Sequence, residues 1–318
     1  MFTYILLILG FFFLIKGAEL LVDGSSSLAK RFRISNIVIG LTIVAFGTSA
    51  PELIINIISS FRGSADLAIG NIIGSSIANI LLIGGVAAMI YPLRILGGTA
   101  KKEIPLSLGA VILLLLLVND FFIPKTGMLF LSRLDGMILL GFFLIFIYYT
   151  FGLLKTESKQ TEEYEKYHLS ITLAYIVIGV VSLFIGGQWV VSSVSKIALQ
   201  FGFSQALMGL TIIAIGTSLP ELATSAVAAY KKNADLAVGN IVGSNIFNIF
   251  WILGLSAIIK PLAFNEALNT DILVAIGSTV ILFYFVLTGK ESRRVERWEG
   301  VALFCFYLIY LVFLIWRG

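Results

Sequence analysis

Long apolar runs separated by short polar loops make up most of this chain. A helix needs about 20 mostly apolar residues to cross a bilayer, and runs of that length recur along all 318 residues. The first run lacks the basic flank of a signal peptide, so we expect it to be part of the structure. We predict ten membrane-spanning helices, at 1–23, 36–60, 67–91, 104–123, 134–154, 169–192, 204–229, 236–259, 270–288 and 299–316.

The two halves of the chain are copies of each other. A shift of 169 residues aligns 40–53 (GLTIVAFGTSAPEL) with 209–222 (GLTIIAIGTSLPEL), with 11 of 14 positions identical. It also aligns 66–80 (DLAIGNIIGSSIANI) with 235–249 (DLAVGNIVGSNIFNI), with 11 of 15 identical. Each copy holds five predicted helices, and an odd number makes the second copy enter the membrane from the opposite side. We therefore expect an all-α membrane protein with ten transmembrane helices in two inverted five-helix repeats, at 1–154 and 169–318, joined by a linker at 155–168.

The composition agrees with this class and excludes several others. Hydrophobic residues make up 58% of the chain and charged residues 13%, about half the charged share of a soluble domain. The mean hydropathy is +1.01. The single cysteine, Cys305, excludes an internal disulfide, and the single histidine, His168, excludes a two-histidine zinc or haem site.

Basic residues predict the orientation in the membrane. The net charge is +4, but the basic residues lie in short loops, which is typical of membrane topology and not of a nucleic-acid-binding surface. Of the 22 basic residues, 15 fall on one side of the predicted helices and 6 on the other. The richer side should be cytoplasmic. We expect a plasma-membrane protein in the lipid bilayer, with both termini outside, the linker inside and no evident protein partner.

Polar breaks interrupt the second and seventh predicted helices near mid-membrane. Each break reads Gly-Thr-Ser-x-Pro-Glu, at 47–52 and 216–221. A proline cannot donate to the carbonyl four residues earlier, and a freed carbonyl in a membrane must find a partner or line a cavity. The threonine and the glutamate are four residues apart and share a helical face. Hydroxyl, carbonyl and carboxylate oxygens are the ligands of hard cations.

The next helix of each repeat adds polar residues spaced by four, namely Asn71, Ser75 and Asn79, then Asn240, Ser244 and Asn248. An ionised carboxylate at mid-membrane needs a counter-charge or a water-filled cavity. In the predicted helices around the two glutamates, no lysine or arginine lies at a matching depth. We expect the two acids to meet and to be neutralised by cations. The alternatives are a protonated acid bonded to a neighbouring helix, hydroxyls bonded back to their own helix and asparagines that link helices.

These paired motifs resemble the two alpha-repeats of the cation/calcium exchanger superfamily, and most closely those of prokaryotic sodium/calcium antiporters. The resemblance covers the whole chain. It implies a transporter and not an enzyme, without a cofactor, that exchanges calcium for sodium by alternating access. The family layout of one calcium and three sodium positions implies electrogenic exchange. The metal ligands that the resemblance implies are Glu52, Glu221, Thr48, Thr217, Ser49, Ser218, Ser75, Ser244, Asn79, Asn248, Ala45 and Ala214.

Three other functions remain as alternatives. A proton/calcium antiporter of this superfamily would carry a glutamate where Gly74 and Gly243 stand, so this resemblance favours sodium. Some relatives carry an aspartate at the position of Asn248, and the asparagine here weakens the case for potassium co-transport. A cation channel would usually form its acidic ring by oligomeric symmetry. An intramembrane enzyme needs paired aspartates or histidines, which the predicted helices do not offer.

Overall fold

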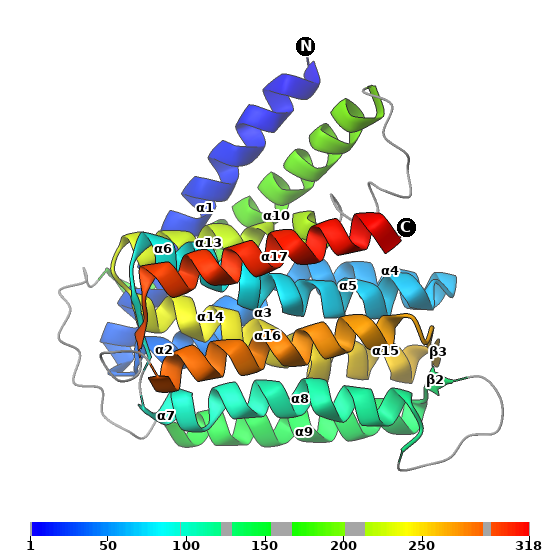
Figure 1. Cartoon of the computed structure of the whole chain (residues 1–318). Coiled ribbons are helices and arrows are strands. Elements are labelled where there is room, and N and C mark those ends of the chain that lie inside the picture. Colours follow the sequence, from blue (N-terminus) through cyan, green and yellow to red (C-terminus); the bar gives the residue numbers. More distant parts are fainter. Residues whose placement is uncertain are drawn as a thin grey trace.

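The computed structural model describes residues 2–95, 97–121, 129–153, 167–200, 214–288 and 294–317. Helices account for most of these residues, and most of them run roughly parallel in one bundle (Figure 1). This agrees with the prediction of an all-α protein.

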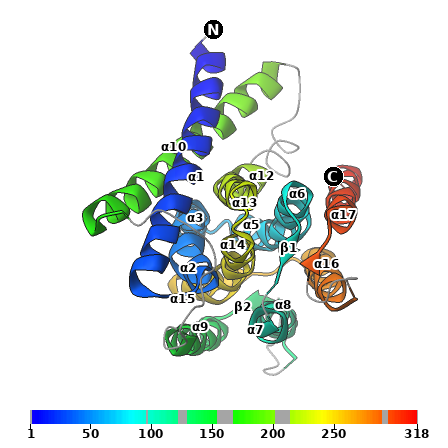
Figure 2. The same ribbon diagram turned by 90° about the vertical axis from the view of Figure 1, so that its left-hand side faces the viewer.

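Two nearly continuous helices form the centre of the bundle. In the first half, α5 (Ala65–Ala78) continues through the π-helical turn η2 (Asn79–Ile83) into α6 (Gly84–Ile90). In the second half, α14 (Ala234–Ile246) continues through η4 (Phe247–Leu253) into α15 (Gly254–Ile259). In their most apolar stretches 78% and 83% of the residues are buried, against 22–39% in the other long helices. The two elements carrying the Asn-Ser-Asn residues are therefore the innermost ones (Figure 2).

Four helices pack around this centre, namely α8 (Glu103–Val118), α9 (Arg133–Leu153), α16 (Leu268–Thr288) and α17 (Arg297–Arg317). Glycines allow close approach at two of these contacts. A Cβ added to Gly85 would lie 2.9 Å from the Gly300 carbonyl oxygen, and one added to Gly136 would lie 2.7 Å from that of Gly254. Since the 169-residue shift carries Gly85 onto Gly254, the α6–α17 contact has its counterpart in the α15–α9 contact.

The helices α1 (Phe2–Phe32) and α10 (Leu169–Gln200) form a separate pair that leans away from the bundle (Figures 1 and 2). They also meet at glycines. A Cβ on Gly17 would lie 2.9 Å from the Gly179 carbonyl oxygen, and one on Gly186 would lie 2.8 Å from that of Gly10. The same shift exchanges these two contacts, because it relates Gly10 to Gly179 and Gly17 to Gly186.

Short segments join the two halves at the ends of the bundle. The strand β1 (Leu93–Arg94) pairs antiparallel with β4 (Arg294–Val295), and β2 (Phe130–Leu131) with β3 (Leu262–Ala263). The short helix α7 (Gly97–Lys101) precedes α8.

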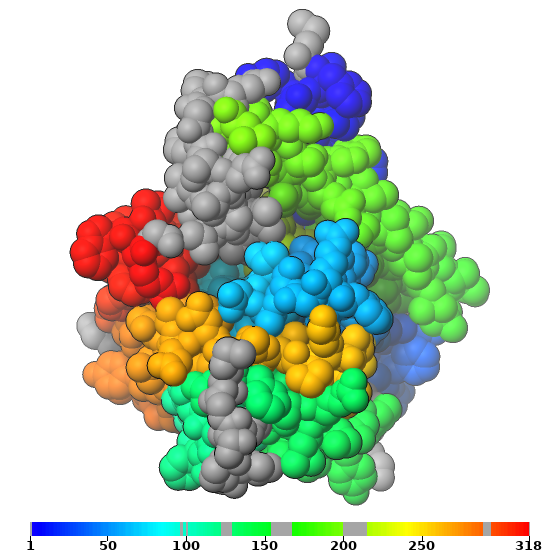
Figure 3. Space-filling view, turned by 90° about the vertical axis from the view of Figure 1, so that its right-hand side faces the viewer, coloured from blue at the N-terminus to red at the C-terminus, as the bar shows by residue number. Residues whose placement is uncertain are grey.

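The second predicted helix is broken into α2 (Asn36–Ile39), the π-helical η1 (Gly40–Val44), α3 (Ala45–Thr48) and α4 (Ala50–Arg62). α4 ends where Gly63 adopts a φ of 77°, the left-handed conformation that favours glycine at a helix end. This turn, in light blue, lies near the middle of the face in Figure 3.

The predicted number of spans is confirmed only in a coarser form. In the described residues, seven helices are long and apolar enough to cross a membrane, or eight if the bent pair 36–48 and 50–62 is one span. α8 falls short of that length with 16 residues. The first part of the predicted helix at 204–229 lies outside the described residues. Most of the linker at 155–168 lies outside them too. The protein is therefore an all-helical membrane protein with several spans.

Candidate cation-binding site

The two predicted breaks are present, and both have the same geometry. Ser49 separates α3 from α4 with φ −83° and ψ 9°, and Ser218 separates α12 (Ala214–Thr217) from α13 (Leu219–Tyr230) with φ −86° and ψ 5°. The two parts of the first broken helix meet at 47°. Each proline lies at the start of the new helix, where its missing N–H costs nothing. Each glutamate therefore lies in the first turn of a helix, where the helix dipole favours negative charge.

Glu52 and Glu221 are completely buried, and serine hydroxyls link each of them to the break of the other repeat. The Ser75 hydroxyl donates to Glu52 Oε1 over 3.4 Å, and the Ser49 hydroxyl donates to Glu221 Oε1 over 3.0 Å. The second of these bonds joins the two halves of the chain. In the described residues, no ion pair with lysine or arginine involves either carboxylate. Within the described ranges, the two acids thus have no basic counter-charge.

Several buried oxygens of the predicted ligands have no hydrogen-bond partner among the residues that the structure describes. They are Glu52 Oε2, Glu221 Oε2, Asn79 Oδ1, Asn248 Oδ1 and Ser244 Oγ. A buried polar atom without a partner is costly, and a cluster of such oxygens calls for an explanation. All five are carboxylate, amide or hydroxyl oxygens, which are the ligands of hard cations. The residues present therefore fit a cation between the two glutamates.

The serines link the parts of the site. Ser75 also accepts hydrogen bonds from Ser218 Oγ and from Asn248 Nδ2, both over 3.1 Å. The structure thus connects Glu52, Ser75, Ser218 and Asn248 in one network across the two repeats. Ser244, the counterpart of Ser75, is fully buried and makes no such bond to any residue that the structure describes.

The two threonines are held by asparagines that we did not include among the predicted ligands. The Thr48 hydroxyl donates to Asn240 Oδ1 over 3.0 Å, and the Thr217 hydroxyl donates to Asn71 Oδ1 over 3.2 Å. These two bonds are exchanged by the 169-residue shift. Asn71 and Asn240 already stood out in the sequence, because they begin the polar series on α5 and α14.

The structure gives less support to the two carbonyl groups predicted as ligands. The Ala45 carbonyl accepts from Ser49 N over 3.0 Å and from Thr48 Oγ1 over 3.4 Å, so it already has two donors within its own helix. Ala214 begins α12. All twelve residues stay predicted ligands, and none of the contacts above identifies a bound ion.

One residue beside the site was missed altogether. Asn245, on α14, is buried and accepts a hydrogen bond from Asn79 Nδ2 over 2.9 Å. The sequence held a signal for it, since Asn245 is one of the few positions in its segment where the repeats differ. The first repeat has Ser76 there.

A cavity of about 370 Å³ lies between α4, α10 and the α12–α13 break. Its lining includes Pro51, Gln188, Ser192 and Thr217. Since the Thr217 hydroxyl is one of the predicted ligands, the cavity reaches the edge of the candidate site.

Known proteins resemble this chain over nearly its whole length. The family profile described as sodium/calcium exchanger protein matches residues 2–152 and 171–316. The sodium/calcium exchanger MaX1 of Methanosarcina acetivorans is 32% identical over 98% of both chains. The Ca(2+)/H(+) antiporter ChaA of Bacillus subtilis is 26% identical over 85% of this chain and 81% of its own. A solved structure of the sodium-calcium exchanger NCX_Mj, soaked with 10 mM Na+ and no Ca2+, superposes with a TM-score of 0.83 at 30% identity, covering 98% of each chain.

Proposed function

Since the chain belongs to the sodium/calcium exchanger family, we propose that it exchanges calcium for sodium across the membrane by alternating access. Membership of this family supports a transporter of cations and not an enzyme. The relative MaX1 carries the name of a sodium/calcium exchanger. The matching fold of NCX_Mj supports the same pair of ions.

The observation that carries this proposal is the pair of buried glutamates, each with one oxygen that has no partner in the described part of the chain. Two carboxylates in a low-dielectric interior repel each other, and cations between them remove that cost. One calcium ion neutralises both charges. The site then has its highest free energy when it is empty. The protein should therefore change conformation more readily with ions bound than without them.

The same pair of charges supports electrogenic exchange. Three sodium ions on two carboxylates leave a net charge of +1, whereas one calcium ion leaves none. If three sodium ions move against each calcium ion, every cycle carries one positive charge across the membrane.

We further propose that ten transmembrane helices form two inverted repeats, 1–154 and 169–318, with both termini outside the plasma membrane. Contacts exchanged by the 169-residue shift support the inversion, in particular the glycine contacts between α1 and α10. Within these repeats, the twelve predicted ligands are proposed to surround the two glutamates.

Proton coupling is the second candidate, and the similarity to ChaA favours it. Gly74 and Gly243 favour sodium, because they leave these two positions without an acid. The two functions differ in the gradient that drives calcium, so a single transport assay separates them.

The test is uptake of radioactive calcium into vesicles that contain the purified protein. We expect uptake to follow an imposed outward sodium gradient and to change when an ionophore sets the membrane potential. Uptake that ignores the sodium gradient but follows a pH step would support proton exchange. Uptake that follows only the calcium gradient would indicate a channel, and either result would overturn the proposal.

A further inference from the structure

The side chain of Asn245 reaches from the second repeat into the first, whereas its counterpart does not cross. Ser76 donates to the Ile72 carbonyl of its own helix over 2.9 Å. Asn245 donates instead to the Ser76 carbonyl over 3.4 Å and accepts from Asn79 Nδ2 over 2.9 Å. Both residues are buried, so these bonds are shielded from water.

The bond from Asn79 determines which end of its amide is engaged. An asparagine amide has one oxygen acceptor and one nitrogen donor group. The nitrogen is bound to Asn245, and the oxygen Oδ1 is buried without a partner in the part of the chain that the structure describes. An N–H group turned toward a cation would repel it, whereas an oxygen is a ligand. The Asn245 bond therefore leaves the ligand end of Asn79 available.

The counterpart asparagine is held by a different group. Asn248 Nδ2 donates to Ser75 Oγ over 3.1 Å, and Asn248 Oδ1 has no partner in the described ranges. Ser75 also serves Glu52 and Ser218, so this hydroxyl is fully engaged by the protein. If the two repeats were symmetric here, Asn79 would bond to Ser244 as Asn248 bonds to Ser75.

Asn245 takes the place of Ser244 as the anchor of Asn79. Ser244 Oγ is consequently left without a partner among the described residues. One departure from the repeat thus leaves two oxygens available, Asn79 Oδ1 and Ser244 Oγ. In the corresponding pair, Asn248 and Ser75, the Ser75 hydroxyl is engaged. The site is asymmetric although its sequence is duplicated.

We propose that Asn245 is a positioning residue that turns the Asn79 amide oxygen toward the transported cation and keeps the Ser244 hydroxyl available to it. Asn245 does not touch the ion in this proposal. Asn245 acts through Asn79. The proposal rests on the cation-binding role proposed above for the two glutamates.

The test replaces Asn245 with the residue of the other repeat. In Asn245→Ser, we expect the KM for calcium to rise about 10- to 100-fold, the loss typical when a group that orients a metal ligand is removed. The maximal rate at saturating calcium should fall by less than about threefold, because the change weakens binding and not the later steps. Asn245→Ala should give the same pattern. Ser76→Ala is the matched control, because it removes only a bond within one helix, and its KM should equal that of the wild type.

A second arm distinguishes positioning from a structural role. In an Asn79→Ala background the group that Asn245 orients is gone, so Asn245→Ser should change the KM little further. A KM unchanged by Asn245→Ser, or raised by the same factor with and without Asn79, would overturn the proposal.

Equilibrium binding of calcium to the purified protein is measured beside transport. Calcium binding that weakens in Asn245→Ser supports the positioning role even if the wild type does not couple calcium to sodium. Failure of that coupling overturns only the proposed function. A wild type that binds no calcium overturns both proposals.

Discussion

The two sides of the candidate site differ although their sequences are copies. On the side of α10, the cavity of about 370 Å³ opens beside Pro51 and Thr217. Residues Gln188 and Ser192 of α10 are part of its lining. This side of the site therefore borders a cavity, and we call it the hollow side.

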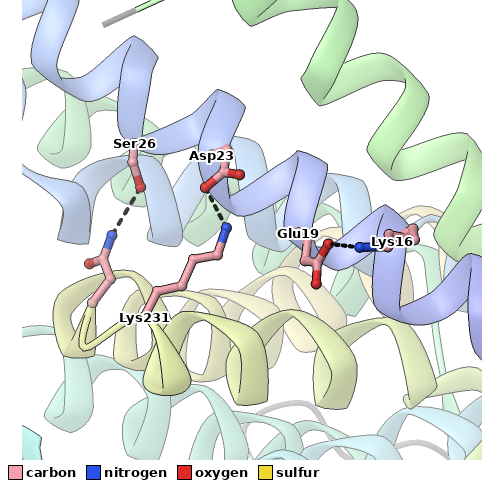
Figure 4. Close-up of polar contacts among 6 residues, drawn as sticks. Lys16, Glu19, Asp23, Ser26 and Lys231 are labelled. Atoms are coloured by element: carbon pink, nitrogen blue, oxygen red, sulfur yellow. Dashed lines mark hydrogen bonds and ion pairs between the residues drawn. The ribbon is translucent and has the colours of Figure 1, made fainter. Parts of the chain in front are cut away.

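The equivalent side faces α1, and there the helices are packed together. The 169-residue shift relates Gln188 to Glu19 and Ser192 to Asp23. Asp23 Oδ1 pairs with Lys231 Nζ at 2.5 Å, at the end of α13, and Asn233 Nδ2 donates to Ser26 Oγ over 3.0 Å (Figure 4). Thr48, the counterpart of Thr217, is fully buried. These contacts close the α1 side.

The difference shows how a duplicated sequence can form an asymmetric structure. A carrier with inverted repeats exposes its site to one side of the membrane at a time. One hollow side and one closed side are what such a carrier has while it faces one way. The sequences of the two sides need not be identical for this, and here an ion pair joins α1 to the bundle on the closed side.

The largest effect is expected at the centre, which both sides share. Glu52→Gln and Glu221→Gln each remove half of the negative charge that holds the cation. We expect each to reduce sodium-dependent calcium uptake by more than about 100-fold, beyond the loss typical of groups that only support a metal ligand. The two losses should be similar, because both glutamates serve the same ion.

The control for this prediction is Glu103→Gln. Glu103 is also a buried acid, but it lies on α8 and bonds to Tyr149. Its exchange should stay near that of the wild type. Full exchange by either site variant would contradict the central role of the glutamates.

A smaller effect is expected from filling the cavity. Ser192→Phe places a large side chain in the hollow side and should slow exchange about tenfold, which corresponds to about 1.4 kcal/mol of barrier. Equilibrium binding of calcium should be unchanged. Val177→Phe, at an exposed position of the same helix, is the matched control. Equal rates in the two variants would show that ions do not pass through this cavity.

The smallest effect is expected from the ion pair on the closed side. Lys231→Ala removes the partner of Asp23, and a half-exposed pair contributes about 0.2–1 kcal/mol. The balance between the two conformations should therefore shift by at most about fivefold, toward opening on the α1 side. The ratio of the KM values for calcium at the two membrane faces measures this shift.

Lys16→Ala is the control for that measurement. Lys16 pairs with Glu19 of the same helix at 2.6 Å (Figure 4), so its loss leaves the contact between α1 and the bundle intact. An identical change of the KM ratio in both variants would show that the charge of α1, and not the contact, matters.

The sequence was sufficient to predict the breaks and the meeting of the acids. A proline four residues after a glycine breaks a helix by local chemistry alone, and the duplicated motif indicated that both breaks serve one site. The burial of Glu52 and Glu221 could also be expected, because both lie far from the ends of their predicted helices.

Partner choice inside the site could not be predicted. Ser75 and Ser244 are identical in type and context, yet Ser75 takes part in three hydrogen bonds and Ser244 in none of those described. That difference depends on which groups of the other repeat lie within about 3 Å, which spacing along one helix does not specify. The bonds of Asn245 were missed for this reason.

Calcium-soaked crystals, measured by anomalous diffraction at a long wavelength, test the central claim most directly. The account predicts an anomalous peak between the two glutamates, about 2.3–2.6 Å from Glu52 Oε2 and from Glu221 Oε2, as calcium–oxygen bonds require. A calcium ion bound elsewhere, with both carboxylates bonded only to protein groups, would contradict it.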